Sequence, residues 1–386
     1  MSNQKKILFI CDKDECTSFG RLTLNLVKAV APQYEAHVLW LKTPKFFGPR
    51  SDMGNVPKSG YVSHEIWAKS LYEGYLSFRK PLRRIIRDVS PDCVFFIRPE
   101  LGFLIPVAKR ELRRLNDGAR VTMFIHDTFA ETLYPHSLKF RLINLFYTRP
   151  TIQADSFVYN SRWTQNHAVQ YFGKKLESSP GTVIGCPIDS DLFNRPAIKV
   201  TAEERSEFRR KFRLKNYDGM CLNVSLDEPR KNIETFFEMA RLCPDTAFVR
   251  VGKLSDRLRE IINVKKLYNV HHFEQFSAQE LREFYRHADL IVYPSFLEGF
   301  GLPPIEAIAC GTPAVCAATS AVQENLEGVC PLVSPADDAN QYANVWQQVK
   351  NGEDVVDWNA AANLLEHCSM KSFSLRVCDF FKSIGL

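Results

Sequence analysis

The chain has 386 residues, of which 45% are hydrophobic and 24% charged, and its formal net charge is +6. This composition is ordinary for a globular protein, and the length exceeds what one hydrophobic core usually supports, so we expect two domains. No stretch reaches roughly eighteen consecutive apolar residues, and the N-terminal MSNQKKILFI lacks the apolar core of a signal peptide. We therefore expect a cytoplasmic protein without a membrane-spanning helix.

The first half of the chain alternates short apolar runs with amphipathic segments. Segments with helical spacing, such as RLTLNLVKAVA and IPVAKRELRRL, separate apolar runs that have the length of buried strands. These runs lie at residues 5–11, 36–41, 93–98, 120–126, 156–161 and 182–187. Alternation of this kind predicts an α/β domain with a doubly wound parallel sheet.

The same pattern begins again in the second half. Apolar runs at residues 220–225, 246–252, 270–274 and 289–295 alternate with helical segments such as IETFFEMARL. We predict two Rossmann-like domains, over residues 1–188 and 189–368, and a C-terminal helix over 369–386 that packs back towards the first domain. Ligands of such sheets bind at the carboxyl ends of the strands, and the cleft between two such domains is the expected site.

One segment of the second half, SFLEGFGLPPIEAIACGTPAV (295–315), combines glycines, prolines and two carboxylates in an apolar run. PPIEAIAC is expected to form a short helix with the prolines in its first turn, so the preceding loop brings backbone N–H groups to a helix N-terminus. Such a position stabilises an anion. Gly299 and Gly301 would let the main chain approach the ligand without a Cβ in the way.

Two carboxylates and two cations complete this pattern. Glu298 precedes the glycines, and Glu306 is expected in the first helical turn, so both could accept hydrogen bonds from hydroxyls on either side of a bound anion. In PRKN, Arg230 and Lys231 follow a strand and could clamp a diphosphate. A nucleoside-diphosphate sugar has this layout of ribose, diphosphate and sugar. Taken singly, each residue could equally be a solvated loop or helix residue.

The sequence EGFGLPPIEA, followed by ACGTPAV, resembles the signature of the family 4 glycosyltransferases, which are retaining enzymes of the GT-B fold with an E-x7-E motif. PRKN, VIGCPIDSDLF, ADSFVYNSRWTQ and FSAQELREFYRHADLIVYPS are similar to further segments of that family. The resemblance covers residues 5 to about 335. It implies two facing Rossmann-like domains with a cleft between them, the first for the acceptor and the second for the nucleotide-sugar.

The resemblance also implies roles for the residues at the donor. Glu298 would contact hydroxyls of the donor sugar near the reacting carbon, and Glu306 would bind the ribose. Lys231, with Arg230, would neutralise the leaving diphosphate. Backbone groups would hold the diphosphate and sugar at Gly299, Phe300, Gly301 and Leu302.

Two residues of the first half complete the implied site. His126 ends the run RVTMFIH and matches the family's active-site histidine near the anomeric carbon. Gly20, in SFGRL, matches the first loop, although the family usually has two glycines there and this chain has one. The family's G-R before the phosphate-binding lysine is also replaced, by Ser225 and Leu226, and Arg230 could compensate.

The implied reaction transfers a sugar with retention, through same-face attack in which the departing phosphate takes the proton of the acceptor. Neither a cofactor nor a metal is expected, because Arg230, Lys231 and the helix start would carry the charge of the leaving group. Two DxD triplets, 12–14 and 189–191, are the alternative. DxD holds a metal and a diphosphate in the other large glycosyltransferase fold, but it is short and common.

Positive charge is concentrated in the first half. Residues 1–190 contain 27 Lys and Arg against 17 Asp and Glu, whereas residues 191–386 contain 23 against 27. Much of the excess lies in two segments, through Arg79, Lys80, Arg83, Arg84, Arg87, Lys109, Arg110, Arg113 and Arg114. Each segment alone could be a solvated helix face. Together they predict peripheral binding to an anionic membrane surface. We expect no nucleic-acid partner, because no recognition motif accompanies the charge.

The favoured function is therefore retaining transfer of a hexose, with mannose as the first candidate, from a nucleoside-diphosphate sugar to a glycan or lipid-linked acceptor in cell-surface polysaccharide biosynthesis. A nucleotide-sugar epimerase of similar fold is an alternative. So is a subunit that binds a nucleotide-sugar without catalysis. A phosphorylase is disfavoured, because no pyridoxal-binding lysine segment is recognisable.

Overall fold

The chain forms two units, each built around its own sheet. The computed structural model describes residues 4–15, 17–43, 57–58, 60–68, 71–127, 138–195, 200–214, 217–274 and 276–386. Unit 1 consists of Met1–Pro187 and Met370–Leu386, and unit 2 consists of Ile188–Ser369. The expected domain borders at 188/189 and 368/369 each lie one residue away from the observed borders at 187/188 and 369/370.

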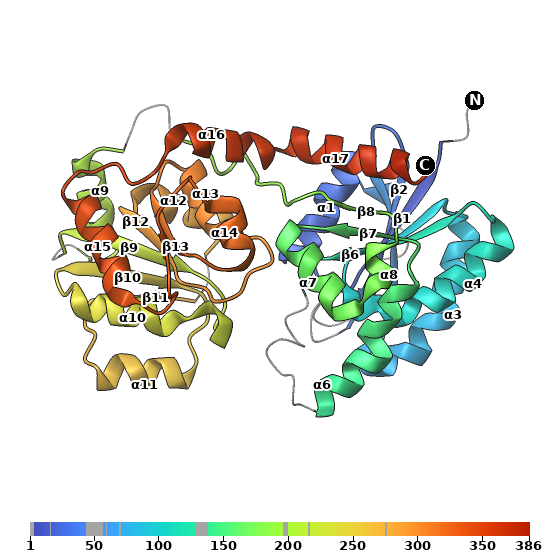
Figure 1. The fold of residues 1–386 in the computed structure, drawn as a ribbon, viewed down its shortest axis with the longest axis horizontal. Coiled ribbons are helices and arrows are strands. Elements are labelled where there is room, and N and C mark those ends of the chain that lie inside the picture. Colours follow the sequence, from blue (N-terminus) through green and yellow to red (C-terminus); the bar gives the residue numbers. More distant parts are fainter. Residues whose placement is uncertain are drawn as a thin grey trace. The chain divides into compact units, whose positions relative to one another are not determined.

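Unit 1 contains an eight-stranded sheet in the order β3-β4-β2-β1-β5-β6-β7-β8 (Figure 1). Its neighbouring strands are parallel except β3 and β4, which pair antiparallel. The strands are β1 (Lys6–Cys11), β2 (Glu35–Lys42), β3 (Pro57–Lys58), β4 (Tyr61–Trp67), β5 (Cys93–Phe96), β6 (Arg120–Ile125), β7 (Ser156–Tyr159) and β8 (Gly181–Val183). The helical elements are α1 (Ser18–Val30), α3 (Leu71–Val89), η1 (Pro99–Leu104), α4 (Ile105–Leu115), α6 (Leu138–Ile143), η2 (Asn144–Thr148), η3 (Arg149–Gln153), α7 (Arg162–Phe172), α8 (Lys174–Glu177) and α17 (Met370–Ser383).

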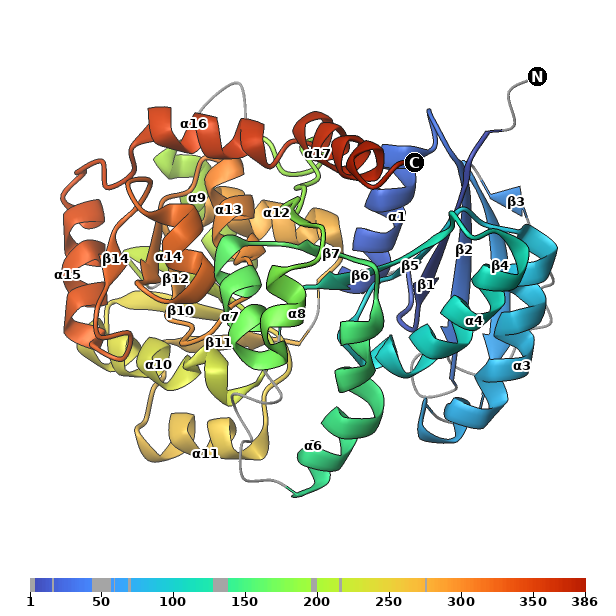
Figure 2. The same ribbon diagram turned by 45° about the vertical axis from the view of Figure 1, so that its right-hand side comes forward.

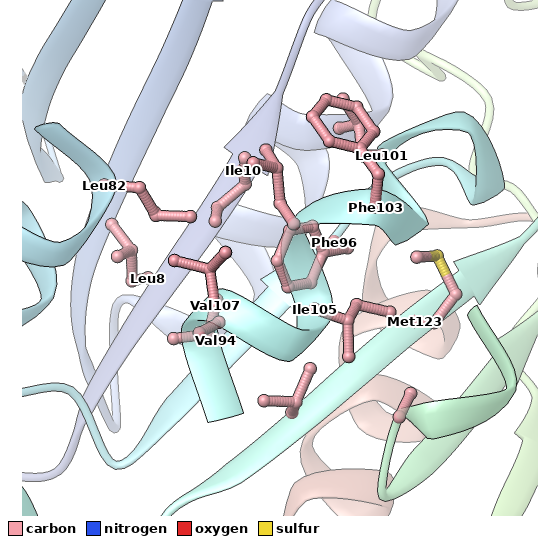
Figure 3. Packing of buried hydrophobic residues seen from close by; sticks show 14 of the residues in the cluster. Leu8, Ile10, Leu82, Val94, Phe96, Leu101, Phe103, Ile105, Val107 and Met123 are labelled. Atoms are coloured by element: carbon pink, nitrogen blue, oxygen red, sulfur yellow. The ribbon is translucent and has the colours of Figure 1, made fainter. Parts of the chain in front are cut away.

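Both faces of this sheet are buried, which explains why its central strands β1 and β5 are apolar runs. In β1, Leu8 and Ile10 belong to a first core and Ile7 and Phe9 to a second, as the two-residue period of a strand requires. Figure 3 shows the first core, in which Leu8 and Ile10 pack with residues of β5, α3 and α4.

The second core is closed by α1 and α17, which lie side by side in unit 1 (Figures 1 and 2). Phe373, Val377 and Phe381 of α17 are buried in this core, and Arg376 Nε donates to the carbonyl oxygen of Ile184 at 2.8 Å. Burial of one such apolar side chain contributes about 1.5–3 kcal/mol. The helix expected over 369–386 is thus part of the core of unit 1.

Unit 2 contains a parallel six-stranded sheet in the order β11-β10-β9-β12-β13-β14. The strands are β9 (Gly219–Val224), β10 (Thr246–Val251), β11 (Val270–Phe273), β12 (Leu290–Tyr293), β13 (Ala314–Ala317) and β14 (Leu332–Val333). The helical elements are α9 (Ala202–Lys211), η4 (Pro229–Lys231), α10 (Ile233–Leu242), α11 (Asp256–Val264), α12 (Ala278–His287), α13 (Leu302–Ala309), α14 (Ser320–Leu326), α15 (Ala339–Lys350) and α16 (Trp358–His367). Phe236, Phe248 and Trp346 lie in its core.

In both sheets the strand order reverses next to the first strand of the unit. The reversal lies between β1 and β5 in unit 1 and between β9 and β12 in unit 2. Open α/β sheets bind ligands at the carboxyl ends of the strands at this point. No helix in the part of the chain that the structure describes is both long and apolar enough to cross a membrane.

Candidate functional site

In unit 2, the loops that follow β9 and β12 are tied together where the strand order reverses. The N–H of Phe296 donates to the carbonyl oxygen of Arg230 at 2.8 Å. Asn232 Nδ2 donates to the carbonyl oxygens of Pro294 and Ala336, both at 3.0 Å. Asn232 has a left-handed φ of 50°, which asparagine tolerates better than most residues. These contacts fix the Arg230-Lys231 pair beside the loop that carries Glu298.

Glu298 is the centre of a buried cluster of charged and polar groups. Lys231 Nζ lies 2.5 Å from Oε1 of Glu298, and Arg230 Nη1 lies 3.1 Å from Oε2. Tyr293 Oη donates to Oε1 at 2.7 Å, and Arg230 Nε also binds Glu228 at 2.7 Å. A carboxylate has about four acceptor sites. Protein donors fill three of those of Glu298, which leaves one for a ligand hydroxyl.

The cluster keeps Glu298 ionised. Burial alone would raise the pKa of Glu298, but the charges of Lys231 and Arg230 outweigh burial and hold this pKa below its usual value. Burial lowers the pKa of Lys231, and the charge of Glu298 opposes that change. Burial and the neighbouring carboxylate of Glu298 raise the pKa of Tyr293, so its hydroxyl remains a hydrogen-bond donor.

The sequence placed Glu298 and the two cations at different parts of a ligand, whereas the structure joins them directly. Arg230 and Lys231 are therefore charge-balanced by protein carboxylates, and a diphosphate would share or compete for them. Tyr293, which also donates a hydrogen bond to Glu298, was not identified as a site residue from the sequence. Its position at the end of the run LIVY, five residues before Glu298, is the signal that could have identified it.

The loop before α13 presents backbone donors. Among the described residues, the N–H groups of Phe300, Gly301 and Leu302 have no hydrogen-bond partner. Gly301 has a φ of +91°, and an added Cβ would lie 3.0 Å from Val322 Cγ2, so glycine is required there. The next two residues are prolines without N–H groups. The candidate anion site is therefore formed by N–H groups of the loop more than by N–H groups of the first helical turn.

Glu306 lies further along α13 than expected. The helix begins at Leu302, so Glu306 is its fifth residue and belongs to the second turn. The expectation of a first-turn carboxylate is wrong, because the two prolines occupy that turn. Tyr285 Oη of α12 donates to Glu306 Oε2 at 3.1 Å, which fixes the carboxylate on the helix face next to α12.

In unit 1, the loops after β1 and β5 hold a second group of charges. Asp12, 1% exposed, accepts two hydrogen bonds from Arg98 Nη1, at 3.1 and 3.2 Å. Arg98 Nη2 lies 2.7 Å from Glu100 Oε1. The guanidinium also stacks over the ring of Phe19 at 4.9 Å. The sequence did not reveal this ion pair, because Arg98 follows Asp12 by 86 positions.

His126 lies at the carboxyl end of β6, close to this group. Its ring is 4.3 Å from that of Phe19, and its Nε2 is 3.4 Å from Asp127 Oδ2. Burial lowers the pKa of His126, opposed by the charge of Asp127, so the imidazole is neutral at pH 7. Its Nδ1 is buried without a hydrogen-bond partner among the described residues. A buried unsatisfied nitrogen of this kind is suited to a ligand hydroxyl.

Gly20 is part of α1 and not of the preceding loop. An added Cβ would come 1.9 Å from the carbonyl oxygen of Asp14. The structure therefore explains this glycine by the close passage of Asp14 and Glu15 over the helix. His126 and Gly20 belong to unit 1, whereas the Glu298 cluster and Glu306 belong to unit 2.

The two DxD triplets have other partners. Asp12 is bound by Arg98 through both oxygens, and Asp189 accepts a hydrogen bond from the N–H of Leu192 at 3.2 Å in an exposed turn. Within the described ranges, no group of three or more His, Cys, Asp and Glu side chains is placed to hold a metal ion.

Comparisons with known proteins cover both units. The family model described as Glycosyltransferase Family 4 matches residues 19–192, and that described as Glycosyl transferases group 1 matches residues 204–362. The O-antigen chain mannosyltransferase RfbU of Salmonella typhimurium is 30% identical over 176 residues, which are 44% of this chain and 47% of that protein. O-antigen chain mannosyltransferase B of Escherichia coli is 28% identical over 42% of this chain and 44% of that protein. These matches span about half the length of the curated relatives.

Solved structures resemble the whole chain. A sucrose-phosphate synthase from Thermosynechococcus elongatus has a TM-score of 0.77 at 17% identity, over 98% of this chain and 99% of that one. Anabaena Alr3699/HepE in complex with UDP-glucose has a TM-score of 0.72 at 17% identity, over the same shares of the two chains. At these identities the likeness establishes the fold, which is GT-B. With that fold, and with each unit matched by a glycosyltransferase family model, the chain belongs to the family 4 glycosyltransferases.

Proposed function

We propose that the protein is a retaining hexosyltransferase that uses a nucleoside-diphosphate sugar as donor and extends a glycan or lipid-linked acceptor of a cell-surface polysaccharide. The observation that carries this proposal is the buried cluster of Glu298, Lys231, Arg230 and Tyr293 beside the free N–H groups before α13. It offers cations and N–H donors to a diphosphate and a carboxylate to sugar hydroxyls. The named activity of the two O-antigen relatives supports mannose as the transferred sugar. A cytoplasmic location at the inner face of the membrane is a further part of the proposal.

The proposed roles follow the contacts of each residue. Lys231 and Arg230 turn from Glu298 towards the β-phosphate as the sugar–phosphate bond breaks. Glu298, with one acceptor site left, takes a hydroxyl of the donor sugar near C1. Glu306 binds the ribose, and the N–H groups of the 299–302 loop hold the diphosphate. His126, neutral and with an unsatisfied Nδ1, binds a sugar hydroxyl from unit 1.

In the proposed reaction, the bond between C1 and the phosphate oxygen breaks and a bond from C1 to the acceptor oxygen forms on the same face. The acceptor proton moves to the departing phosphate oxygen, so no protein nucleophile is needed. The charge that develops on the diphosphate is stabilised by groups already in place, which is the largest contribution in many enzymes.

The donor is tested by ligand-induced stabilisation of the full chain. One of GDP-mannose, UDP-glucose, UDP-galactose and a dTDP-sugar is expected to raise the Tm by several degrees, because a ligand at a hundredfold excess over its Kd contributes about 2.7 kcal/mol. The shift should disappear in Glu306→Gln and persist in Glu327→Gln, which changes an exposed carboxylate of the same unit. Release of nucleotide only when an acceptor glycan is added would establish transfer. A shift in Tm without turnover would favour a non-catalytic subunit. Interconversion of the free sugar nucleotide would favour an epimerase.

Metal removal gives a second expected result. Transfer should be unchanged after treatment with EDTA, because Arg230 and Lys231 supply the positive charge that a divalent cation supplies elsewhere. The measurement is the rate of nucleotide release with EDTA, and again with added Mg²⁺ or Mn²⁺. A loss that Mn²⁺ restores would contradict this and direct attention to the carboxylates of the DxD triplets.

A further inference from the structure

Unit 1 carries a ridge of exposed apolar side chains on α6 and η2, which form one continuous helical segment from Leu138 to Thr148. Leu138, Leu142, Leu145 and Phe146, here named the α6 ridge, are 71%, 49%, 54% and 61% exposed. Their spacing places them along one side of the segment. Both Figure 1 and Figure 2 show α6 extending away from the strands of its own unit.

The opposite side of this segment is anchored in unit 1. The ring of Tyr147 packs on that of Phe103 at 4.9 Å, and Thr148 is buried. The ridge is therefore held outward by the packing of its own helix. Exposed apolar residues that occur singly need no explanation, but a group of four on nine residues marks an interaction site.

The charge around the α6 ridge has one sign. Residues 132–154 contain no Asp or Glu, and their basic residues are Lys139, Arg141 and Arg149. Arg141 and Arg149 are exposed. A helix with an apolar face and basic flanks is the form that lies in the interface of a bilayer.

The element that follows the α6 ridge in the sequence, η3, lines a basic groove, here named the η3 groove. Ile152 and Gln153 of η3 line it together with cations from α4 and α8, and its volume is about 750 Å³. Arg110, Arg113 and Lys175 line it without a carboxylate partner among the described residues. The groove can therefore accept anionic groups.

Several of the basic residues that the sequence offered for membrane contact are neutralised within the protein. Arg87 binds Glu111 at 2.5 Å, Arg84 lies 3.6 Å from Asp88, and Lys109 pairs with Asp155. Their attraction to a distant anionic surface is reduced by these partners. The η3 groove and the α6 ridge are therefore the stronger candidates for membrane contact.

We propose that the α6 ridge inserts into the surface of a bilayer containing anionic lipid, with the cations of the η3 groove facing the headgroups. The proposal deepens the proposed function and rests on it, because a transferase with a lipid-linked acceptor must meet that acceptor at a membrane. A protein partner or a second copy fits less well. Stable protein interfaces bury about 800 Å² on each side, far more than four side chains on one short helix provide.

The test measures co-sedimentation of the full chain with vesicles of phosphatidylcholine and phosphatidylglycerol. The wild type should bind these vesicles and bind vesicles of phosphatidylcholine alone more weakly, because the cations then have no anionic partner. The double variant Leu142→Ser/Phe146→Ser should partition at least about tenfold more weakly, since each buried CH₂ contributes about 0.8 kcal/mol. Leu375→Ser is the matched control, because Leu375 is 58% exposed on α17 of the same unit. It should bind as the wild type does.

The proposal is overturned if the wild type does not bind the anionic vesicles, or if the double variant binds them as well as the wild type does. It is also overturned if the wild type is an oligomer that the double substitution dissociates, because the ridge would then contact a second copy. Transfer to a water-soluble acceptor separates this proposal from the proposed function. That rate should be unchanged in Leu142→Ser/Phe146→Ser. A wild type without transfer to any acceptor would instead count against the proposed function.

Discussion

Replacement of Glu298 by alanine is expected to abolish transfer and also to lower the free energy of unfolding of unit 2 by about 3–5 kcal/mol. The first effect follows from the loss of the group that holds Lys231 and Arg230, and removal of one such electrostatic contact typically costs about 10²–10³-fold in rate. The second follows from burial, because the side chains of Glu298 and Lys231 are each only 8% exposed. Without the carboxylate, Lys231 becomes a buried cation without a charged partner.

The expected loss of stability distinguishes a buried ion pair from a solvated loop residue, whose replacement would leave the fold intact. Urea unfolding measures the loss of stability. Hydrogen exchange of peptides that cover β9 and β12 assigns this loss to unit 2. Removing both partners in Glu298→Gln/Lys231→Met should recover much of it, because neither charge is then left unpaired. Glu327→Ala, an exposed change in the same unit, should stay within about 0.5 kcal/mol. If Glu298→Ala were as stable as Glu327→Ala, the buried ion pair would be refuted.

A change of Arg98 to methionine is expected to have the second-largest effect, a destabilisation of unit 1 by about 3–5 kcal/mol. Asp12 is 1% exposed and accepts two hydrogen bonds from Arg98 Nη1, so the variant leaves this buried carboxylate without its hydrogen-bonded cation, and the Nζ of Lys13 remains 3.9 Å away. The adjoining His126 would then face two carboxylates, Asp12 and Glu100, that have lost the guanidinium of Arg98. Transfer should fall as well, because Arg98 joins the segments that follow β1 and β5, and its charge acts on the neighbouring Asp127 after β6.

Arg84→Met provides a matched control. Arg84 also pairs with an aspartate in unit 1, but its side chain is 85% exposed and the distance to Asp88 is 3.6 Å. Exposed pairs of this kind contribute about 0–1 kcal/mol. Hydrogen exchange of peptides from β1 and β5 should therefore increase in Arg98→Met and not in Arg84→Met. Asp12→Asn/Arg98→Met should recover part of the loss, and equal losses in the two single variants would contradict the assignment.

The sequence predicted the strands best where both faces are buried. β1, β5 and β6 are continuous apolar runs, as central parallel strands require. β4 was not recognised, because YVSHEIW (61–67) places Ser63, His64 and Glu65 in its middle. Two of these, His64 and Glu65, have partners on the neighbouring strand β2. Lys42 of β2 pairs with Glu65 at 2.5 Å, and His37 of β2 lies 3.0 Å from His64.

The candidate site was predictable where it is local in sequence and not where it depends on pairing. The glycines and Glu298 lie together in one loop, so a single stretch of sequence indicates them. Lys231 precedes Glu298 by 67 positions, and only the neighbouring placement of β9 and β12 brings them to 2.5 Å. The sequence therefore identified both residues without revealing their contact, and missed the ion pair of Asp12 and Arg98 altogether.

The position of α17 has a consequence for how the protein is made. At a synthesis rate of roughly 5–20 residues per second, all of unit 2 leaves the ribosome between the two stretches of unit 1. Unit 2 is continuous and can close while the face of β1 that bears Ile7 and Phe9 still lacks Phe373, Val377 and Phe381. A nascent chain that ends at Ser369 would thus combine a complete unit 2 with an open apolar surface on unit 1. Such a chain is a natural client for a chaperone until the last helix arrives.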